Sequence, residues 1–241
     1  MKKILSVVLV LAMLFGSTMV CNAGNPDDYT DITGHWASIA LESAVTNNIL
    51  TGYNHKISPN SIITRAEMAT IIVKAFGAEE RADISQYTDV PSSKWYADYM
   101  SRAVKMGIMG GEGDKLRPED PVTREEAFSM LAKAFELSSQ DLSPLDQFKD
   151  KDQVDENLRS EIAAMISAGY VSGGGGILTP KATLLRGQIA QVIYLMAKTY
   201  VKLPGTYETI DPGSVIIRVP DVTLKNLTVK GCWRQKQHNR L

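Results

Sequence analysis

A four-residue motif that returns at long, regular intervals most constrains how this chain can fold. Thr64-Arg65-Ala66-Glu67 recurs 59 residues later as Thr123-Arg124-Glu125-Glu126, and a degenerate copy, Leu185-Arg186-Gly187-Gln188, follows 62 residues after that. Self-similarity at such a period is typical of structural repeats, in which each copy is one supersecondary unit. The chain is therefore expected to contain three similar units.

The motif predicts the start of a helix. Thr64 and Glu67 have the spacing of a capping box, in which the Thr hydroxyl accepts from the backbone N–H three residues on and the Glu carboxylate reaches back to the Thr N–H. Thr123 and Glu126 repeat this pair, and the third copy has lost it. An apolar run with helical spacing follows each copy. The inner faces are predicted to hold Met68, Ile71, Ile72, Ala75 and Phe76; Phe128, Leu131, Ala132 and Phe135; and Ile189, Val192, Ile193 and Met196.

Arginine holds the second position of all three copies, although the first turn of a helix mildly disfavours a cation. A helix N-terminus attracts anions through its free N–H groups, and a guanidinium adds a fork suited to a carboxylate or phosphate. A single such arginine would be interpreted as a solvated surface charge. Because the position is filled three times, we interpret Arg65, Arg124 and Arg186 as anion-binding residues, and we expect them to contribute little to folding.

Other features recur in a fixed order. An aromatic residue stands two positions before an aspartate, a tryptophan follows in the first two units, and a glycine turn precedes a proline. In the first unit these residues are Tyr29, Asp31, Trp36, Gly52 and Pro59, and in the second they are Tyr87, Asp89, Trp95, Gly110-Gly111 and Pro118. The third unit has Phe148, Asp150, Gly173 to Gly176 and Pro180, with Asn157 in place of the tryptophan. A first helix is predicted near 36–48, 95–106 and 157–168. In the first unit, Trp36, Ala40, Ser43 and Asn47 are predicted to share one face, which Ile39, Ala44 and Val45 widen. Glycine after it is expected to supply the left-handed conformation that stops a helix.

The N-terminus has the composition of an export signal. Lys2 and Lys3 precede an apolar run, 4–15, that is too short to span a bilayer, and Cys21-Asn22-Ala23 fits a small-residue cleavage site. We assign 1–23 to a signal peptide and expect no membrane span after its removal. A lipid anchor on Cys21 is the alternative, ranked second because Val20 is larger than the residues such sites prefer.

Composition and residue spacing disfavour several function classes. A net charge of −1 argues against nucleic-acid binding through phosphate neutralisation, and two cysteines imply no disulfide framework. His35, His55 and His238 share no motif, so neither a metal site nor a nucleophile–histidine pair is indicated, and no cofactor is expected. The glycines at 173–176 lack the Lys-Ser/Thr of a phosphate loop.

The chain changes character after the third unit. Polar linkers separate the units at 77–86 and 136–147, whereas 205–241 contains turns and β-branched segments at 215–219 and 222–229 that predict strands. The basic segment 231–241 is expected to be disordered.

Taken together, these motifs resemble the S-layer homology domain, over about residues 29–200. The resemblance implies a mainly α fold of three helix–loop–helix repeats in a pseudo-threefold assembly, here at 29–80, 87–138 and 148–200. The tail at 205–241 then looks like the opening of a β-rich, β-helical domain. Members of this family hold secreted bacterial proteins non-covalently to secondary cell-wall polysaccharide, often pyruvylated, and some form surface layers.

The resemblance also implies binding residues in grooves between repeats. They are Asp31, Trp36 and Arg65; Asp89, Trp95 and Arg124; and Asp150 and Arg186. This set suits a polysaccharide, since aspartate accepts from hydroxyls, indole packs on a sugar face and arginine forks onto a carboxylate. As alternatives, Asp31 and Asp89 are helix caps, and Trp36 and Trp95 are core residues.

Two other function classes remain open at this point. Glu67 and Glu126 are candidates for a glycosidase carboxylate pair, although the capping box accounts for both more simply. The repeats are also compatible with a lattice-forming module whose partners are other surface-layer proteins.

The signal-peptide assignment predicts export and cleavage after Ala23. The mass of the secreted protein, measured intact, should correspond to a chain that begins at Gly24. A secreted species that begins at Met1, or a lipid adduct on Cys21, would contradict this assignment.

Overall fold

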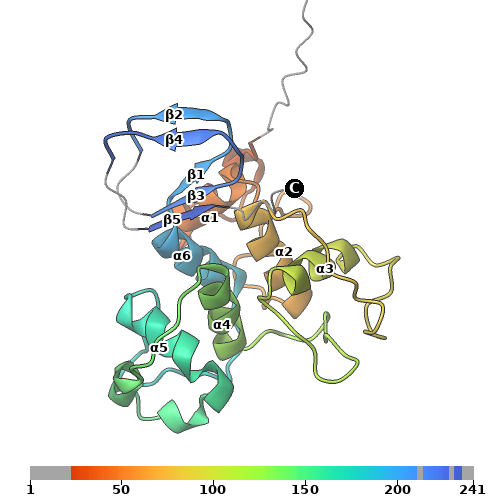
Figure 1. Ribbon diagram of the computed structural model, residues 1–241, viewed down its shortest axis with the longest axis vertical. Helices are drawn as coiled ribbons and strands as arrows, with labels where there is room; N and C mark the ends of the chain where they lie inside the picture. The colour runs from red at the N-terminus through yellow and green to blue at the C-terminus, as the bar shows by residue number, and fades with distance from the viewer. Residues whose placement is uncertain (1–22, 211–213, 228–230, 235–241) are drawn as a thin grey trace, which may run out of the picture.

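The structure is a computed structural model that describes residues 23–210, 214–227 and 231–234 (Figure 1). Each repeat contributes two α-helices, and short parallel strands follow the third repeat. The helices are α1 (Ser38–Thr46) and α2 (Arg65–Phe76), α3 (Ala97–Lys105) and α4 (Arg124–Ala134), and α5 (Arg159–Ser167) and α6 (Arg186–Met196). Single 3-10 turns lie at Pro26–Asp28, Ser143–Gln147, Lys151–Gln153 and Glu156–Leu158. The mainly α fold with a β-containing tail is confirmed. The predicted signal peptide lies almost wholly outside the described residues.

The helices pair between repeats (Figure 1). The second helix of each repeat packs closely against the first helix of the next one: α2 lies against α3, α4 against α5, and α6 returns to α1. This exchange closes the three repeats into a ring. Since each helix buries its apolar face on a neighbouring repeat, one repeat by itself would leave much of its core exposed.

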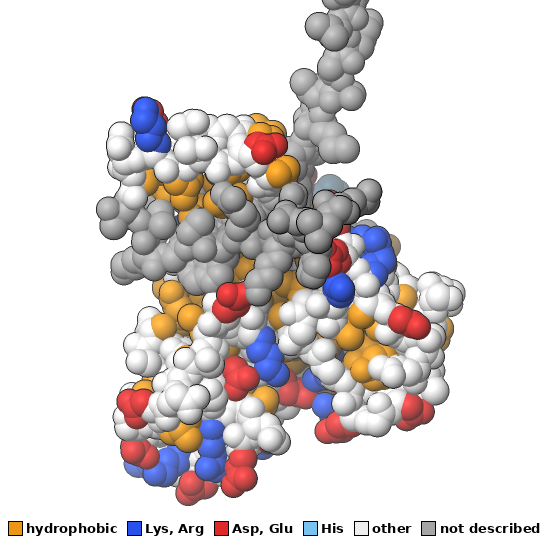
Figure 2. Space-filling model, viewed as in Figure 1, with side chains coloured by type: hydrophobic (Ala, Val, Ile, Leu, Met, Phe, Trp, Pro, Cys, Tyr) orange, Lys and Arg blue, Asp and Glu red, His pale blue; other side chains and the backbone are white. Residues whose placement is uncertain are grey.

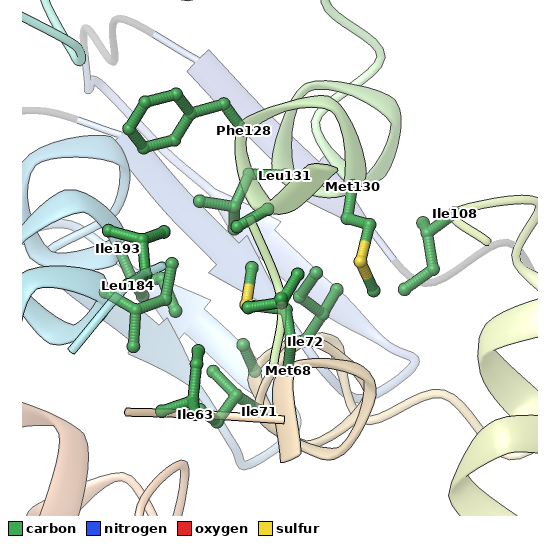
Figure 3. Close-up of a cluster of buried hydrophobic side chains, with 14 of the residues drawn as sticks. Ile63, Met68, Ile71, Ile72, Ile108, Phe128, Met130, Leu131, Leu184 and Ile193 are labelled. Atoms are coloured by element: carbon green, nitrogen blue, oxygen red, sulfur yellow. The ribbon is translucent and has the colours of Figure 1, made fainter. Parts of the chain in front are cut away.

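The core lies where the three motif helices converge (Figure 3). Met68 and Ile72 from α2, Leu131 from α4 and Ile193 from α6 meet there, each no more than 3% exposed. Ile63 and Leu184 precede two of these helices and fill the same cluster. The predicted inner faces of the motif helices are therefore confirmed, with Val192 only partly buried.

The predicted face of the first helix was partly right, since Ala40, Ala44 and Val45 are buried, and wrong for Trp36 and Ile39, which are exposed. Ala40, Leu41, Ala44 and Val45 form the buried face of α1, whereas Trp36 is 65% exposed. The reason is the helix boundary: α1 begins at Ser38, so Trp36 precedes the first turn and helical spacing does not apply to it. The interpretation of the tryptophans as core residues is excluded with it, since Trp95 is 60% exposed.

The repeated glycine also has a different role from the one expected. The left-handed residue that follows each first helix is Asn48, Gly107 or Gly169. Gly111, in contrast, lies where a Cβ atom would stand 2.5 Å from Lys115 O and 2.5 Å from the Tyr87 ring. Its equivalents, Gly52 and Gly173, are equally confined, against Tyr29 and Phe148. This glycine therefore allows the opening aromatic residue of each repeat to pack on the backbone of the loop.

The tail forms two small parallel sheets above the helices (Figure 1). The first has the order β1-β3-β5 and the second pairs β2 with β4. The strands are β1 (Thr199–Val201), β2 (Gly205–Tyr207), β3 (Ser214–Ile217), β4 (Val222–Leu224) and β5 (Gly231–Arg234). Paired residues are 16 or 17 positions apart in sequence, as Thr199 with Val215 and Gly205 with Val222. The expectation of disorder is wrong for 231–234, which form β5, and 235–241 lie outside the described residues.

Arg218 and Lys202 both bond the sheets to the helical ring, Lys202 through Nζ to Thr46 O at 3.3 Å. Arg218 follows β3 and donates from Nε to Ala75 O of α2 at 2.8 Å and from Nη1 to Asn47 O at 3.0 Å. Its guanidinium lies 4.7 Å from the centre of the partly buried Tyr200 ring. Burial raises the pKa of Tyr200 above its ordinary value. Because Ile216 joins the helical core while Val215 and Ile217 pack within the tail, β3 connects the two parts.

Adjacent glycines in the second repeat provide a matched test of this packing. Gly111→Ala should destabilise the fold by about 1–3 kcal/mol, because the new methyl group overlaps Lys115 O and the Tyr87 ring. Gly110→Ala is the control, since a Cβ atom there meets nothing within 4 Å. Urea unfolding should separate the two variants. Equal midpoints would show that close packing is not the reason for the glycine.

Candidate functional site at the inter-repeat junctions

The first turn of each motif helix is hydrogen-bonded to the loop of the next repeat. The N–H groups of Arg65 and Ala66 donate to Asp120 O and Pro118 O, both at 2.9 Å. The equivalent bonds run from Arg124 and Glu125 to Ala182 and Pro180, and from Arg186 and Gly187 to Ser61 and Pro59, at 2.8–3.0 Å. We call these three contacts the 1/2, 2/3 and 3/1 junctions, after the repeats that they join.

These bonds change the expected role of the helix N-termini. At α2, Glu67 N is also occupied, since it donates to the capping hydroxyl of Thr64 at 3.2 Å. Glu126 N does the same with Thr123 at 3.3 Å. The free N–H groups invoked for an anion are thus already used by the fold at α2 and α4. Any anion at these junctions must be bound by side chains.

Arg65 crosses the 1/2 junction and is buried there, with 7% exposure. Its Nε donates to Leu116 O at 3.0 Å, and its Nη1 pairs with Glu126 at 2.7 Å. Burial lowers the pKa of Arg65, and Glu126 opposes that shift, so the group remains a cation. The same Oε1 of Glu126 also accepts from Arg117 Nη2 at 2.8 Å. Arg65 therefore connects two repeats through a desolvated ion pair.

Arg186 closes the ring at the 3/1 junction in the same way. Nε donates to Ile57 O at 2.8 Å, Nη2 donates to Thr51 O at 2.9 Å, and Nη1 pairs with Glu67 at 3.2 Å. The expectation that these arginines contribute little to folding does not agree with the structure. That expectation was based on the unfavourable dipole of the arginine's own helix. The acceptors that hold the guanidinium lie on another repeat and could not be seen in the motif.

Arg124 at the 2/3 junction differs from the other two. Nε donates to Leu178 O at 3.0 Å, and the guanidinium lies 5.0 Å from the centre of the Phe128 ring. Among the described residues, no carboxylate forms an ion pair with it, because Gln188 stands where Glu67 and Glu126 stand in the other repeats. Burial lowers the pKa of Arg124, and the charge of Asp150 opposes the shift.

The capping glutamates have two functions at once. In Glu67, Oε2 accepts from Thr64 N at 2.9 Å and Oε1 forms the ion pair with Arg186. In Glu126, Oε2 accepts from Thr123 N at 2.9 Å and Oε1 forms the ion pair with Arg65. Half of this arrangement survives in the third repeat, where Gln188 Oε1 accepts from Leu185 N at 3.0 Å. Both glutamates are thus engaged at separate junctions, which does not favour a glycosidase pair.

The aspartates hold the loops in place and do not cap helices. Asp89 accepts from Leu116 N at 3.0 Å and Arg117 N at 2.7 Å, one bond to each carboxylate oxygen. Asp31 and Asp150 bind the equivalent N–H pairs at 57–58 and 178–179. Burial alone would raise the pKa of Asp89, but the backbone hydrogen bonds outweigh it and the pKa lies below its ordinary value.

Each aspartate stabilises an uncommon backbone conformation. The second residue of each bound pair has a positive φ, although none is glycine: 55° at Ser58, 54° at Arg117 and 52° at Thr179. Such residues are mildly strained and persist where the surroundings hold them. The proline that follows carries the carbonyl that accepts from the motif helix of the preceding repeat in the ring, so the aspartate positions the junction.

Trp36 and Trp95 lie beside the 3/1 and 1/2 junctions. Lys94 and Tyr96, which flank Trp95, both donate to Glu119 at 3.0 Å, and Glu119 lies between the two carbonyl acceptors of the 1/2 junction. His35, which precedes Trp36, lies 3.2 Å from Asn60 Oδ1, and its ring leaves no room for a Cβ atom on Gly187. The residues next to each tryptophan in sequence thus contact the loop that forms the junction.

The residues beside the tryptophan position were not identified from the sequence. At the 2/3 junction the buried Glu125 binds Lys181 and accepts from Asp155 N at 3.1 Å. Lys181 aligns with Asn60 and Glu119, and Glu125 aligns with Gly187 and Ala66. An alignment of the three repeats is the signal that could have identified these two positions. The charge of the side chain at each of them changes from one repeat to the next, whereas the arginine of the motif is kept.

Two absences apply to the described part of the chain. It contains no cluster of histidine, cysteine, aspartate and glutamate with the arrangement of a metal site. None of its helices is long and apolar enough to cross a membrane.

Comparison with known proteins establishes the family. The model of the S-layer homology domain matches residues 28–69, 86–128 and 147–190, which is more than half of the chain. The chain belongs to the S-layer homology domain family, with three tandem repeats. The three matched segments contain the three copies of the arginine motif.

Relatives include both surface-layer proteins and enzymes. The surface-layer 125 kDa protein of Lysinibacillus sphaericus is 28% identical over 219 residues, covering 88% of this chain and 18% of that protein. Exoglucanase XynX of Acetivibrio thermocellus is 28% identical over 171 residues, 69% of this chain and 16% of the enzyme, within the repeat region. The surface layer protein of Brevibacillus choshinensis is 35% identical over 144 residues, 56% of this chain and 12% of that protein. The chain thus spans less than a fifth of these relatives.

The family and the surface-layer relatives place this chain at the bacterial cell wall, as a secreted protein with an anchoring or surface-layer role. The repeats resemble a non-catalytic anchor that is shared by enzymes and lattice proteins.

The junction geometry predicts unequal effects of removing two equivalent arginines. Arg65→Ala should reduce the free energy of unfolding by about 1.5–3 kcal/mol, since it deletes a charged hydrogen bond in a buried site. Arg124→Ala is the matched control and should cost less, because Arg124 forms no ion pair among the described residues. Chemical unfolding of both variants measures the difference. A larger loss from Arg124→Ala would contradict this view of the junctions.

Proposed function

We propose that the repeats anchor this chain by binding secondary cell-wall polysaccharide at the inter-repeat junctions. The observation that carries the proposal is the exposure of two tryptophans at equivalent positions, 65% for Trp36 and 60% for Trp95. Indole has a large apolar face, and an exposed one is a common recognition surface for ligands that combine apolar and polar groups. A sugar ring offers both, through its C–H face and its hydroxyls.

The other candidate residues have roles that fit this proposal. Asp31 and Asp89 position the loops beside the tryptophans, and Asp150 positions the equivalent loop of the third repeat. Arg65 and Arg186 fix the repeats to one another. Arg124 is the motif arginine available for an anionic substituent such as a pyruvate ketal. On the face seen in Figure 2, acidic and basic side chains are interspersed over the helical part, which favours local recognition over attraction by a broad charged surface.

A lattice role is the second candidate, favoured by the similarity to surface-layer proteins. In that case the exposed tryptophans would contact protein. The enzyme relatives match this chain only within the repeat region, so the similarity gives no support for a catalytic role of these repeats.

The proposal predicts that Trp36→Ala combined with Trp95→Ala releases the protein from purified cell walls. We expect the binding to weaken at least about tenfold, or 1.4 kcal/mol, with little change in melting temperature because both side chains are exposed. Leu203→Ala, at an exposed apolar residue in the tail, is the control. Sedimentation with intact walls, and with walls stripped of polysaccharide, measures the effect.

Retention of the double variant on intact walls would contradict tryptophan-mediated binding. Equal binding of the unchanged protein to stripped and intact walls would exclude polysaccharide as the ligand. Concentration-dependent self-assembly that is lost in the double variant would favour the lattice role.

A further inference from the structure

The 3/1 junction differs from the other two in how the chain connects its repeats. Residues 77–96 run from α2 to α3 across the 1/2 junction, and residues 135–158 run from α4 to α5 across the 2/3 junction. Repeats 1 and 3 have no such linker between them, and Arg186 is 129 positions from Ile57, whose carbonyl accepts its Nε. Opening of the ring at this junction therefore releases the most conformational freedom, since the closure entropy grows with the length of chain between the contacts.

The side chains that cross the 3/1 junction do not compensate for the missing linker. Arg186 Nη1 lies 3.2 Å from Glu67, whereas Arg65 Nη1 lies 2.7 Å from Glu126 at the 1/2 junction. The motif residue that follows the arginine is Gly187, which adds no side chain to the contact. A further contact between repeats 1 and 3 would thus have its largest effect on the ring here.

The tail, from β1 to β5, supplies such contacts (Figure 1). It begins just after α6, the last helix of repeat 3, and it reaches α1 and α2, which both belong to repeat 1. Lys202 Nζ donates to Thr46 O at 3.3 Å. Arg218 donates to Asn47 O at 3.0 Å and to Ala75 O at 2.8 Å. The tail therefore joins the two repeats that no linker joins.

These contacts fall on the C-terminal ends of two helices. Thr46 is the last residue of α1 and Asn47 is its C-cap, and Ala75 lies in the last turn of α2. The last carbonyl groups of a helix have no intrahelical partner, and the helix dipole favours a cation beside them. The last turn of α1 has no basic residue, whereas that of α3, its equivalent in repeat 2, has Arg102 and Lys105. The tail thus provides α1 with the cations that its own sequence lacks.

Arg218 is held in place for these bonds by its neighbours. Its backbone N–H donates to Val201 O at 2.9 Å, which fixes it to β1, the strand that follows α6. Its guanidinium lies 4.7 Å from the centre of the Tyr200 ring, also on β1. Its Cβ and Cγ atoms stand 3.4 Å from the position of a Cβ atom built on Gly77, the C-cap of α2. A continuous set of contacts therefore runs from α6 through β1 and Arg218 to α1 and α2.

We propose that the tail is a strap that holds the ring closed at the 3/1 junction, and that Arg218 and Lys202 are the residues by which it binds repeat 1. The inference goes beyond wall binding, because the strap uses none of the residues proposed to contact the ligand. It gives the tail a mechanical function. A load applied on the C-terminal side of the chain reaches repeat 1 through the strap and does not peel α6 away from α1.

Hydrogen exchange of the folded full chain tests the strap at single amides. The N–H groups of Arg186 and Gly187 donate across the 3/1 junction, and those of Arg65 and Ala66 donate across the 1/2 junction. An amide in such a contact exchanges when the contact opens, so its rate measures the opening of that junction. Loss of the strap should therefore accelerate exchange at the first pair of amides and not at the second.

The test variant combines Lys202→Met with Arg218→Met. Acceleration at the 3/1 amides should exceed that at the 1/2 amides at least about tenfold. Lys225→Met is the matched control, since Lys225 pairs with Glu208 at 3.1 Å within the tail, and it should leave both rates unchanged. Arg218→Lys keeps the charge but not the planar fork. It should give a smaller acceleration, confined to the 3/1 junction, and it provides the comparison if the double variant does not fold.

Force measurements test the mechanical function. With handles on Gly24 and on the C-terminal end of the chain, the shortest load path through the folded protein runs from α1 across the strap to β3. The double variant should open at a lower force than the parent and release α6 in a separate step. Lys225→Met should open at the force of the parent.

Two results would overturn the inference. Exchange that is unchanged, or accelerated equally at both junctions, would mean that Arg218 and Lys202 contribute to overall stability alone. Equal opening forces for the parent and the double variant would show that the tail carries no load across the 3/1 junction.

Discussion

The structure depends on the contact between the first turn of each motif helix and the loop of the next repeat. A helix N-terminus leaves backbone N–H groups without intrahelical partners, and burial of such groups without acceptors is costly. Here the carbonyls of the adjacent loop accept them, as Pro118 O does for Ala66 N. Because the third helix returns to the first loop, through Gly187 N and Pro59 O, the contact closes a ring. In each repeat, the first two N–H groups of the motif helix are therefore accepted by another repeat.

The closed ring explains why the motif contains an arginine that is unfavourable when its own helix is considered alone. Arginine in a first turn opposes the dipole of its own helix. At every junction it meets a carbonyl of the next repeat, and Arg65 and Arg186 also meet a carboxylate. These partners, distant in sequence, compensate for the unfavourable dipole interaction. Glu126 joins its own helix cap to Arg65, 61 residues away. A buried pair of this kind specifies which surfaces meet, more than it adds net stability.

Local patterns in the sequence predicted the helices, the capping boxes and the faces of the motif helices. The apolar spacing after Thr64 and Thr123 is long and regular, and both capping boxes are present. The exposure of Trp36 was mispredicted because the helix was expected to begin at Trp36, whereas α1 begins two residues later, at Ser38. The partners of the arginines and aspartates were not predictable, because they lie on loops whose approach is set by the closed ring. The sequence lists candidate residues for the site, but it does not show which of them the fold already uses.

Equivalent positions of the three repeats therefore do not contribute to closure in the same way. Where the capping residue is glutamate, the arginine of the preceding repeat is consumed in the ring, and the outer surface is left with an exposed tryptophan. Where it is glutamine, the ring lacks an ion pair but still closes through backbone hydrogen bonds and the apolar core, as Arg124 N to Ala182 O at 2.8 Å shows. An ion pair at a junction is therefore dispensable for closure. The scaffold that orients the arginine does not depend on the capping residue either, since Arg124 Nε donates to Leu178 O as Arg65 Nε donates to Leu116 O.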